Sequence, residues 1–409
     1  MSFTTSGSAE RPPISPNRRI HLYRVLLSLA SLLISLLIAE GALRLVEKHQ
    51  LGDRAIELIK DPVLGQRVEP YAQGHDANGF RNDTVPQTVD AVALGDSQTW
   101  GVNVERQDAW PQQFSKISGR STYNMGLGGS GPVQYHVLTA QALGLSPKII
   151  VVGLYLGNDI YDAYHLAYQY EAHRDLRSSS EASRLSEDTV GIRAVSLWNE
   201  EKQFHADFGR SSFSGWSFWL REHLALGRLL NRTGLWPGAQ DIDYEIDKRW
   251  AQSHPDHGAV CEVPGRETVF TTAYRLAALD TDEPRIAEGL RISKELLGQI
   301  QNDVDANQVS LMVLLLPTKE TAYAMARSGE SGTNPSYQKL VEMEGRVRSE
   351  LISTCKANRI LYIDALPYLS DALNRGERLY PTTTESHPNA RGYLVIASAV
   401  NENLGKLGL

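Results

Sequence analysis

Short, uninterrupted apolar runs, separated by helix-length segments, constrain the fold of this 409-residue chain more than any other feature. Such runs are typical of strands buried on both faces of a parallel sheet, because a half-exposed strand alternates apolar and polar residues. Helices between them predict a doubly wound α/β layer architecture. The expected strands are 91–94, 121–125, 148–156, 309–316 and 360–363, and the expected helices are roughly 104–118, 132–144, 286–306, 335–357 and 389–405.

One long segment breaks this alternation. Residues 160–285 are rich in aromatic and charged side chains, and they predict a large, mostly helical and loop insertion. Residues 47–88, with their polar turns, are expected to be a linker and an approach to a domain that runs from 89 to 409. Five tryptophans of the insertion are either core residues, the commoner fate, or platforms for sugar rings: Trp198, Trp216, Trp219, Trp236 and Trp250.

A single apolar stretch near the N-terminus is long enough to cross a membrane. As a helix at about 1.5 Å per residue, residues 25–46 span roughly 33 Å. Residues 1–24 hold four arginines and one acid, a bias that predicts a cytoplasmic tip, a transmembrane anchor at 25–46 and an exported body. Two alternatives are a cleaved signal peptide, with Ala39 and Gly41 at the processing site, and a buried core helix.

Charge and cysteine content exclude other classes of protein. Lys plus Arg number 41 against 48 Asp plus Glu, so a nucleic-acid-binding surface is not expected. The two cysteines, Cys261 and Cys355, cannot form a disulfide framework, and they are either one pair or two buried thiols. A metal site at His254, Asp256 and His257 with Cys261 is disfavoured because four ligands are not evident; no cofactor is predicted.

Four short motifs follow the expected strands, at the sheet edge where open α/β folds place their sites. Gly95-Asp96-Ser97 follows the first strand, a glycine-rich segment at 124–130 the second and Asn158 the third, and Glu385-Ser386-His387 precedes the last helix. A serine becomes a nucleophile beside a base, and a histidine held by a carboxylate is the usual base. Glycine-rich backbone and an asparagine amide suit an oxyanion. Taken singly, each motif also fits an ordinary turn.

Together the four blocks resemble the SGNH/GDSL hydrolase superfamily, over roughly residues 90–159 and 308–405. The resemblance implies a flavodoxin-like three-layer α/β/α sandwich with about five parallel strands. It also implies esterase, lipase, or carbohydrate acetylesterase or acetyltransferase activity. Carried over by motif, Ser97 is the nucleophile, His387 the general base, and the oxyanion hole consists of Ser97 N–H, Gly129 and Asn158, with Gly126 or Gly128 as alternatives to Gly129.

Two positions depart from the pattern of that superfamily. Leu156 stands where a glycine usually lies two residues before the asparagine. Thr384 occupies the position, three residues before the histidine, that is usually aspartate. Glu385, one residue closer, either orients the imidazole of His387 or is a solvated loop acid, in which case a backbone carbonyl orients the ring.

The second half of the chain has a narrower resemblance, to exported proteins of bacterial polysaccharide acetylation such as the alginate O-acetylation group. It rests on residues 314–319 and on the segment from Tyr380 to Asn389. Lys319 either faces the same cleft or, more commonly for such a position, lies on the surface. The sequence thus predicts an anchored, exported serine esterase for O-acyl, chiefly O-acetyl, groups of envelope carbohydrate or for small esters. An O-acetyltransferase and a non-catalytic polysaccharide-binding or scaffold subunit are the alternatives.

Overall fold

The computed structural model describes residues 16–52, 58–178, 184–212, 223–232, 239–326 and 334–407. The chain divides into two compact units. One comprises residues 1–54 and 215–237, and the other comprises residues 55–214 and 238–409. Residues 1–15 of the expected cytoplasmic tip lie outside the described residues.

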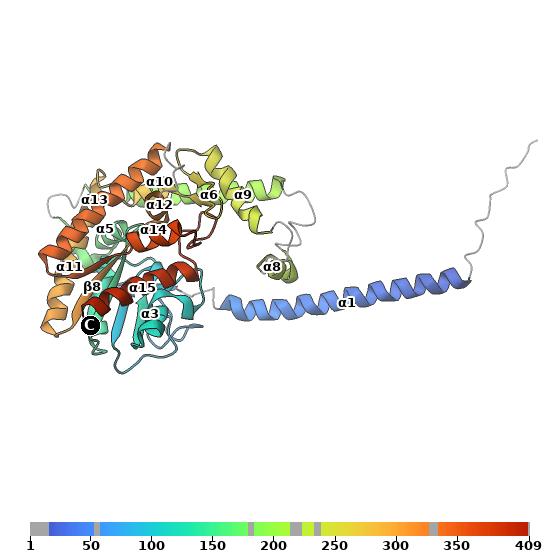
Figure 1. Cartoon of the computed structure of the whole chain (residues 1–409), viewed down its shortest axis with the longest axis horizontal. Helices are drawn as coiled ribbons and strands as arrows, with labels where there is room; N and C mark the ends of the chain where they lie inside the picture. Colours follow the sequence, from blue (N-terminus) through green and yellow to red (C-terminus); the bar gives the residue numbers. More distant parts are fainter. Residues whose placement is uncertain are drawn as a thin grey trace, which may run out of the picture. The chain divides into compact units, whose positions relative to one another are not determined.

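A five-stranded parallel sheet forms the centre of the larger unit (Figure 1). Its spatial order, β4-β3-β5-β8-β9, is the flavodoxin-like order 2-1-3-4-5. The expected strands are confirmed, with each end within one residue of its expected position. They are β3 Ala91–Gly95, β4 Thr122–Gly126, β5 Ile149–Tyr155, β8 Ser310–Leu316 and β9 Leu361–Asp364.

Helices cover both faces of this sheet, because alternate strand residues point to opposite sides. Val92 and Leu94 pack into one apolar cluster, and Ala91 and Ala93 pack into another. The first cluster includes side chains of α4 Pro132–Leu143, α11 Pro284–Ala306 and α13 Pro335–Ala357. The second includes α3 Trp110–Ser118, α14 Leu366–Asn374 and α15 Ala390–Lys406. The expected three-layer sandwich is therefore confirmed.

The two cysteines lie in these two different clusters. Cys355 belongs to the first and Cys261 to the second, and both are buried thiols. Of the two alternatives that the sequence left open, the structure has two separate buried thiols and not a disulfide.

The segment expected to be an insertion is mixed in character. Its first helix, α5 Asp159–Gln169, packs against α11 and α4 and so forms part of the sandwich. The remaining elements add short strands to the expected helices. They are the 3₁₀ helix η2 Glu171–Leu176, α6 Thr189–Ser212, α8 Ala225–Arg232, α9 Ala239–Ser253, the antiparallel pair β6 Ala259–Cys261 and β7 Thr268–Phe270, and α10 Thr272–Ala277.

The segment expected to be a linker also contains structure. It forms an antiparallel pair, β1 Leu58–Asp61 and β2 Gly65–Val68. Beyond the pair, the buried carboxylate of Asp76 accepts hydrogen bonds from Tyr123 Oη at 2.7 Å and Asn82 Nδ2 at 3.1 Å. Asn82 in turn donates to the backbone carbonyl of Asn124 at 2.9 Å. These buried bonds fix the approach segment against β4.

Helix α1, Pro16–Gly52, forms most of the described part of the smaller unit. Its stretch Tyr23–Leu45 is long and apolar enough to cross a membrane, judged by length and composition. Glu40 is an acidic residue within this apolar stretch. Its carboxylate accepts hydrogen bonds from the backbone N–H groups of Ala225 and Leu226, at 2.9 and 3.0 Å, at the start of α8. Arg44 donates to the same carboxylate at 2.7 Å. An anchor and a signal segment both fit this helix.

Candidate active site

Ser97 is the first residue of the short helix α2, Ser97–Trp100, directly after β3. Asp96 caps this helix, with its Oδ1 accepting the backbone N–H of Gln98 at 2.8 Å. Gly95 permits the tight turn, because a Cβ there would lie 2.0 Å from Thr99 Oγ1. The turn presents the Ser97 hydroxyl at the carboxyl edge of the sheet.

The histidine motif, 290 residues away in sequence, meets this serine. His387 Nε2 lies 2.8 Å from Ser97 Oγ, and His387 Nδ1 lies 2.6 Å from Glu385 Oε1. Burial alone would raise the pKa of Glu385, but hydrogen bonds from the ring and backbone of His387 lower it to about 2. An ionised carboxylate only accepts hydrogen bonds, so Nδ1 carries the proton and Nε2 is left to accept from the serine.

Asp96 offers the serine hydroxyl a second acceptor. Its Oδ2 lies 3.2 Å from Ser97 Oγ, which is longer than the contact to His387. Burial raises the pKa of Asp96 to about 6, although the Gln98 N–H partly offsets this. The shorter contact makes His387 the better-placed base of the two.

The expected oxyanion groups share one cavity with the serine and histidine. Ser97, Gly129, Asn158 and His387 all line a cavity of about 270 Å³. The Asn158 side chain donates one N–H to Asp162 Oδ2, which leaves its second amide hydrogen for a ligand. Gly129 has φ +72°, a conformation that favours glycine.

The alternative glycines are less suited to this role. The Gly126 N–H already donates to Asn124 Oδ1 at 2.8 Å. The Gly128 carbonyl accepts from Gln66 Nε2 at 3.3 Å, which ties the glycine-rich turn to β2. Gly129 is the glycine of the three that lines the cavity.

Tyrosines and one arginine complete the cavity walls. Tyr155 ends β5, Tyr161 lies on α5, and Tyr274 and Arg275 lie on α10. The sequence interpretation missed Arg275. It lies in a segment without a recognisable motif, so no sequence signal separated it from the other arginines of the chain.

Residues from the segment expected to be an insertion hold the loop that carries His387. Val269 N–H donates to the carbonyl of Thr382 at 3.1 Å, and Thr268 Oγ1 donates to that of Pro381 at 2.9 Å. Asp247 Oδ2 on α9 accepts the N–H of Thr384 at 2.7 Å. The threonine at the position that is usually aspartate is therefore bonded to an aspartate from elsewhere in the chain.

Lys319 also forms hydrogen bonds to the backbone of this loop. Its side chain is fully buried, so the expectation of a surface lysine is wrong. Its Nζ donates to the carbonyls of Thr383 at 2.8 Å, Glu385 at 3.1 Å and Val269 at 2.8 Å, and lies 3.1 Å from Thr268 Oγ1. Burial lowers the pKa of Lys319 to about 8.

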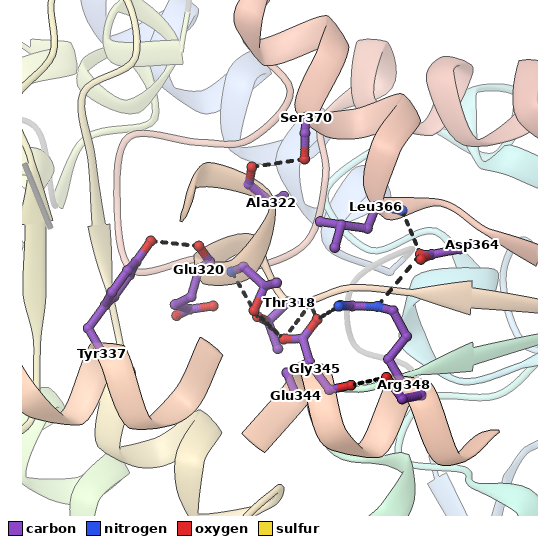
Figure 2. Close-up of polar contacts among 12 residues, drawn as sticks. Thr318, Glu320, Ala322, Tyr337, Glu344, Gly345, Arg348, Asp364, Leu366 and Ser370 are labelled. Atoms are coloured by element: carbon purple, nitrogen blue, oxygen red, sulfur yellow. Dashed lines mark hydrogen bonds and ion pairs between the residues drawn. The ribbon is translucent and has the colours of Figure 1, made fainter. Parts of the chain in front are cut away.

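A buried polar network fixes the helix on which Lys319 lies, α12 Lys319–Met325 (Figure 2). Glu344 on α13 accepts hydrogen bonds from Thr318 Oγ1 at 2.5 Å and Thr321 Oγ1 at 2.6 Å, and it pairs with Arg348. Tyr337, also on α13, donates to the carbonyl of Glu320 at 2.6 Å. The residues directly before and after Lys319, Thr318 and Glu320, are thus both bonded to α13.

The two histidines of the disfavoured metal site have another partner. His254 and His257 both lie beside Glu200, at 3.7 and 2.7 Å. Elsewhere, Glu201, His205 and Asp247 place one ligand atom each within 4.8 Å of one another. Asp247 is already bonded there to His205 and Thr384.

The tryptophans divide between core and surface. Trp250 is buried with Ala251 and Val269, whereas Trp198 is exposed. Trp216, Trp219 and Trp236 lie outside the described residues.

With the sheet order, the serine turn and the histidine loop in place, the fold can be assigned. It is a flavodoxin-like α/β/α sandwich, with Ser97 and His387 in contact at the carboxyl edge of its sheet. No protein-family model matches the sequence, and no curated protein matches it.

Solved structures with likeness to the chain include a protein described as lipolytic and of the G-D-S-L family, from Desulfitobacterium hafniense DCB-2. It is 13% identical with a TM-score of 0.36, over 76% of this chain and 97% of that one. A protein described as an acylhydrolase, from Bacteroides fragilis NCTC 9343, is 12% identical with a TM-score of 0.33, over 78% and 86%. A GDSL-like lipase from Bacteroides thetaiotaomicron VPI-5482 is 11% identical with a TM-score of 0.33, over 79% and 93%. At such low identity, the function of this chain is inferred from its own residues.

Proposed function

We propose that this chain is a serine hydrolase that cleaves ester bonds through an acyl-serine intermediate. The observation that carries the proposal is the unbroken line of contacts from Glu385 through His387 to Ser97, at 2.6 and 2.8 Å. A non-catalytic scaffold would have no need to keep this alignment beside an open cavity. The three groups have the roles of carboxylate, general base and nucleophile.

The reaction follows from this geometry. Ser97 Oγ attacks the acyl carbonyl while His387 Nε2 takes the hydroxyl proton, and Glu385 stabilises the imidazolium that forms. The N–H groups of Ser97 and Gly129 and the Asn158 amide bind the oxyanion. His387 then protonates the departing alkoxide, which leaves an acyl-serine, and a water activated by the same histidine releases the acid. A positioned base contributes about 10²–10⁴-fold to the rate of such a reaction.

The proposed substrates are O-acyl, chiefly O-acetyl, esters of envelope carbohydrate. Tyrosine rings in the cavity wall suit a sugar ring, which packs its apolar face on aromatic side chains. The apolar helix α1 with its basic flank supports an anchored protein whose body is exported. The alternative acceptor for the acyl-serine is a sugar hydroxyl in place of water. With that acceptor, the same residues would catalyse O-acetyl transfer.

The test uses the full-length chain in detergent and 4-nitrophenyl acetate as substrate. Wild type is expected to release 4-nitrophenol, and Ser97→Ala is expected to fall to the background rate. A fluorophosphonate probe should label wild type and not Ser97→Ala. Equal hydrolysis by the two proteins, or no reaction by either, would contradict the proposal.

A further inference from the structure

The apolar stretch of α1 is covered at one place near its far end. Within Tyr23–Leu45 every residue is exposed except Ala39, Glu40 and Leu43, which lie within about one turn of each other. Helix α8 contacts α1 here, and both helices belong to the same compact unit. The other apolar side chains of the stretch, such as Leu33 at 58% exposure, form a continuous apolar surface that needs an apolar environment.

Glu40 is the residue that holds α8 at this place. Its two carboxylate oxygens accept the backbone N–H groups of Ala225 and Leu226, at 2.9 and 3.0 Å. Arg44, one turn further along α1, donates to the same carboxylate at 2.7 Å and to the carbonyl of His223 at 2.7 Å. The first N–H groups of a helix have no partner within it, and a negative charge is favourable beside them. An acid within an apolar span is unfavourable unless it is paired, so the contact satisfies both helices.

Helix α8 has the sequence pattern of a helix that lies in a membrane interface. With eight residues it is shorter than the roughly 12 that an isolated helix needs to be stable in water, so it depends on an external contact. Leu226, Leu229 and Leu230 recur at helical spacing, and Leu229 is 39% exposed. Its sequence holds two arginines and no acid, which suits anionic lipid headgroups. The polar residues at the other positions are Arg228, Asn231 and Arg232.

The position of this contact along α1 agrees with a membrane surface. From position 40 to position 46, where the predicted span ends, a helix rises by about 9 Å. Interfacial helices bury their apolar face about 5–10 Å into the boundary between headgroups and acyl chains. The contact with α8 and the expected lipid boundary therefore fall at the same level.

We propose that α8 is a membrane-surface helix, held by Glu40 at the exported end of α1 with its leucine face in the lipid, and that α1 is retained as an anchor. Cleavage at the alternative processing site, at Ala39 and Gly41, would detach α8 from the span. The chain leaves the larger unit at 214 and returns to it at 238. The body is thus tied to the membrane through α8 as well as through the connection that follows α1.

The test measures lipid contact at α8 in the full-length protein, reconstituted in vesicles of phosphatidylcholine and phosphatidylglycerol. Leu229→Cys carries an environment-sensitive fluorophore, and spin-labelled phosphatidylcholine is the quencher. The fluorescence should be blue-shifted and quenched, as for the same label at Leu33→Cys in α1. Ile117→Cys on α3, with a similar exposure of 41%, is the matched control and should stay unquenched. The two native thiols are buried, and the unsubstituted chain gives the labelling background.

Variants of Glu40 test what holds the helix. Glu40→Ala should remove most of the quenching at position 229 and leave that at position 33 unchanged, because α8 loses its acceptor while the span becomes more apolar. Glu40→Gln should retain part of the quenching, since its amide keeps one oxygen acceptor. Glu402→Ala, which removes an exposed glutamate of α15, should change neither.

Four results would overturn the inference. Unquenched, solvent-like fluorescence at position 229 would place α8 away from lipid. A blue shift without quenching would assign its leucines to a protein contact. Unchanged quenching in Glu40→Ala would remove Glu40 from the role given to it. An intact mass that lacks the first 39 to 41 residues, measured on protein from the membranes of a bacterial host, would show a cleaved signal. None of these measurements depends on ester hydrolysis, so either proposal can fail without the other.

Discussion

The two halves of the candidate site are held in different ways. On the serine side, Ser97 follows a buried strand. The Thr99 side chain leaves no room for a Cβ at Gly95, and the backbone around Trp100 leaves none at Gly126. On the histidine side, the backbone of the loop before His387 is hydrogen-bonded to side chains that are distant in sequence, including Asp247 and Lys319. Local backbone geometry positions Ser97, whereas long-range hydrogen bonds position the loop of His387.

This difference explains what the irregular middle of the chain contributes. The elements α9, β7 and α10 supply bonds to residues of the loop at 381–386. A 1 Å displacement of a catalytic group can cost about 10²-fold in rate, so a loop with few local constraints needs such external support. The serine side, built into the sheet, has no comparable need.

The largest effect should come from removing either member of the central contact. Ser97→Ala, His387→Ala and the double variant should each lower kcat by an amount on the order of 10⁶-fold, because residues that act as a unit are not additive. Single-turnover ester hydrolysis measures this. A double variant that is much slower than both single variants would show that the two sides act separately.

Next in size is the effect at Asn158, whose amide is the proposed oxyanion donor. Asn158→Ala should lower kcat by about 10²–10³-fold, the usual cost of one lost donor. Asp162→Ala should lower it less, because the amide loses only its orienting partner, and Asp162→Asn should retain more activity because it keeps an oxygen acceptor. Steady-state kinetics with 4-nitrophenyl acetate decide this. Full activity in Asn158→Ala would remove Asn158 from the site.

Lys319→Met tests the histidine side directly. We expect kcat to fall by up to about 10²-fold with little change in KM, because the loop shifts while the cavity remains. The conservative Lys319→Arg should keep more activity, and Lys294→Met, on the exposed face of α11, should keep all of it. Slower fluorophosphonate labelling of Ser97 in a variant with wild-type circular dichroism supports the positioning role. Unchanged labelling contradicts it.

On the serine side the matching test is Gly126→Ala. A Cβ at Gly126 would lie 2.3 Å from the backbone nitrogen of Trp100, which has no flexible end to move. The variant should lose about 1–3 kcal/mol of unfolding free energy. Gly128→Ala, whose Cβ meets nothing within 4 Å, is the control. Urea denaturation compares them, and equal midpoints would argue against tight packing at β4.

The smallest effect is the pH dependence of the Glu385 contact. The pKa of Glu385 falls from 4.5 to about 2 in the folded chain, so the folded state favours its ionised form. Its contribution to stability is therefore fully present above pH 4.5 and is lost as the pH falls toward 2. The stability difference between wild type and Glu385→Gln should be constant above pH 4.5 and shrink below it. A difference that does not vary with pH would contradict this assignment.

The sequence predicted much of the fold and the candidate site. All five strands and the positions of Ser97, Asn158 and His387 at one sheet edge followed from continuous apolar runs and the motifs after them. Arg275 and the buried state of Lys319 did not follow. A basic residue in an unpatterned segment gives the same sequence signal whether it lines a cavity, lies in the core or faces solvent.

The sequence alone determined the layers of this protein, because a strand buried on both faces must be apolar throughout and must be covered by helices. It also determined the order of the four motifs along the chain. Only the tertiary structure decided how the histidine loop is held and which charge enters the cavity. Those outcomes depend on contacts between residues far apart in sequence, such as Asp247 with Thr384 and Arg275 with Ser386, and local patterns carry no record of such pairings.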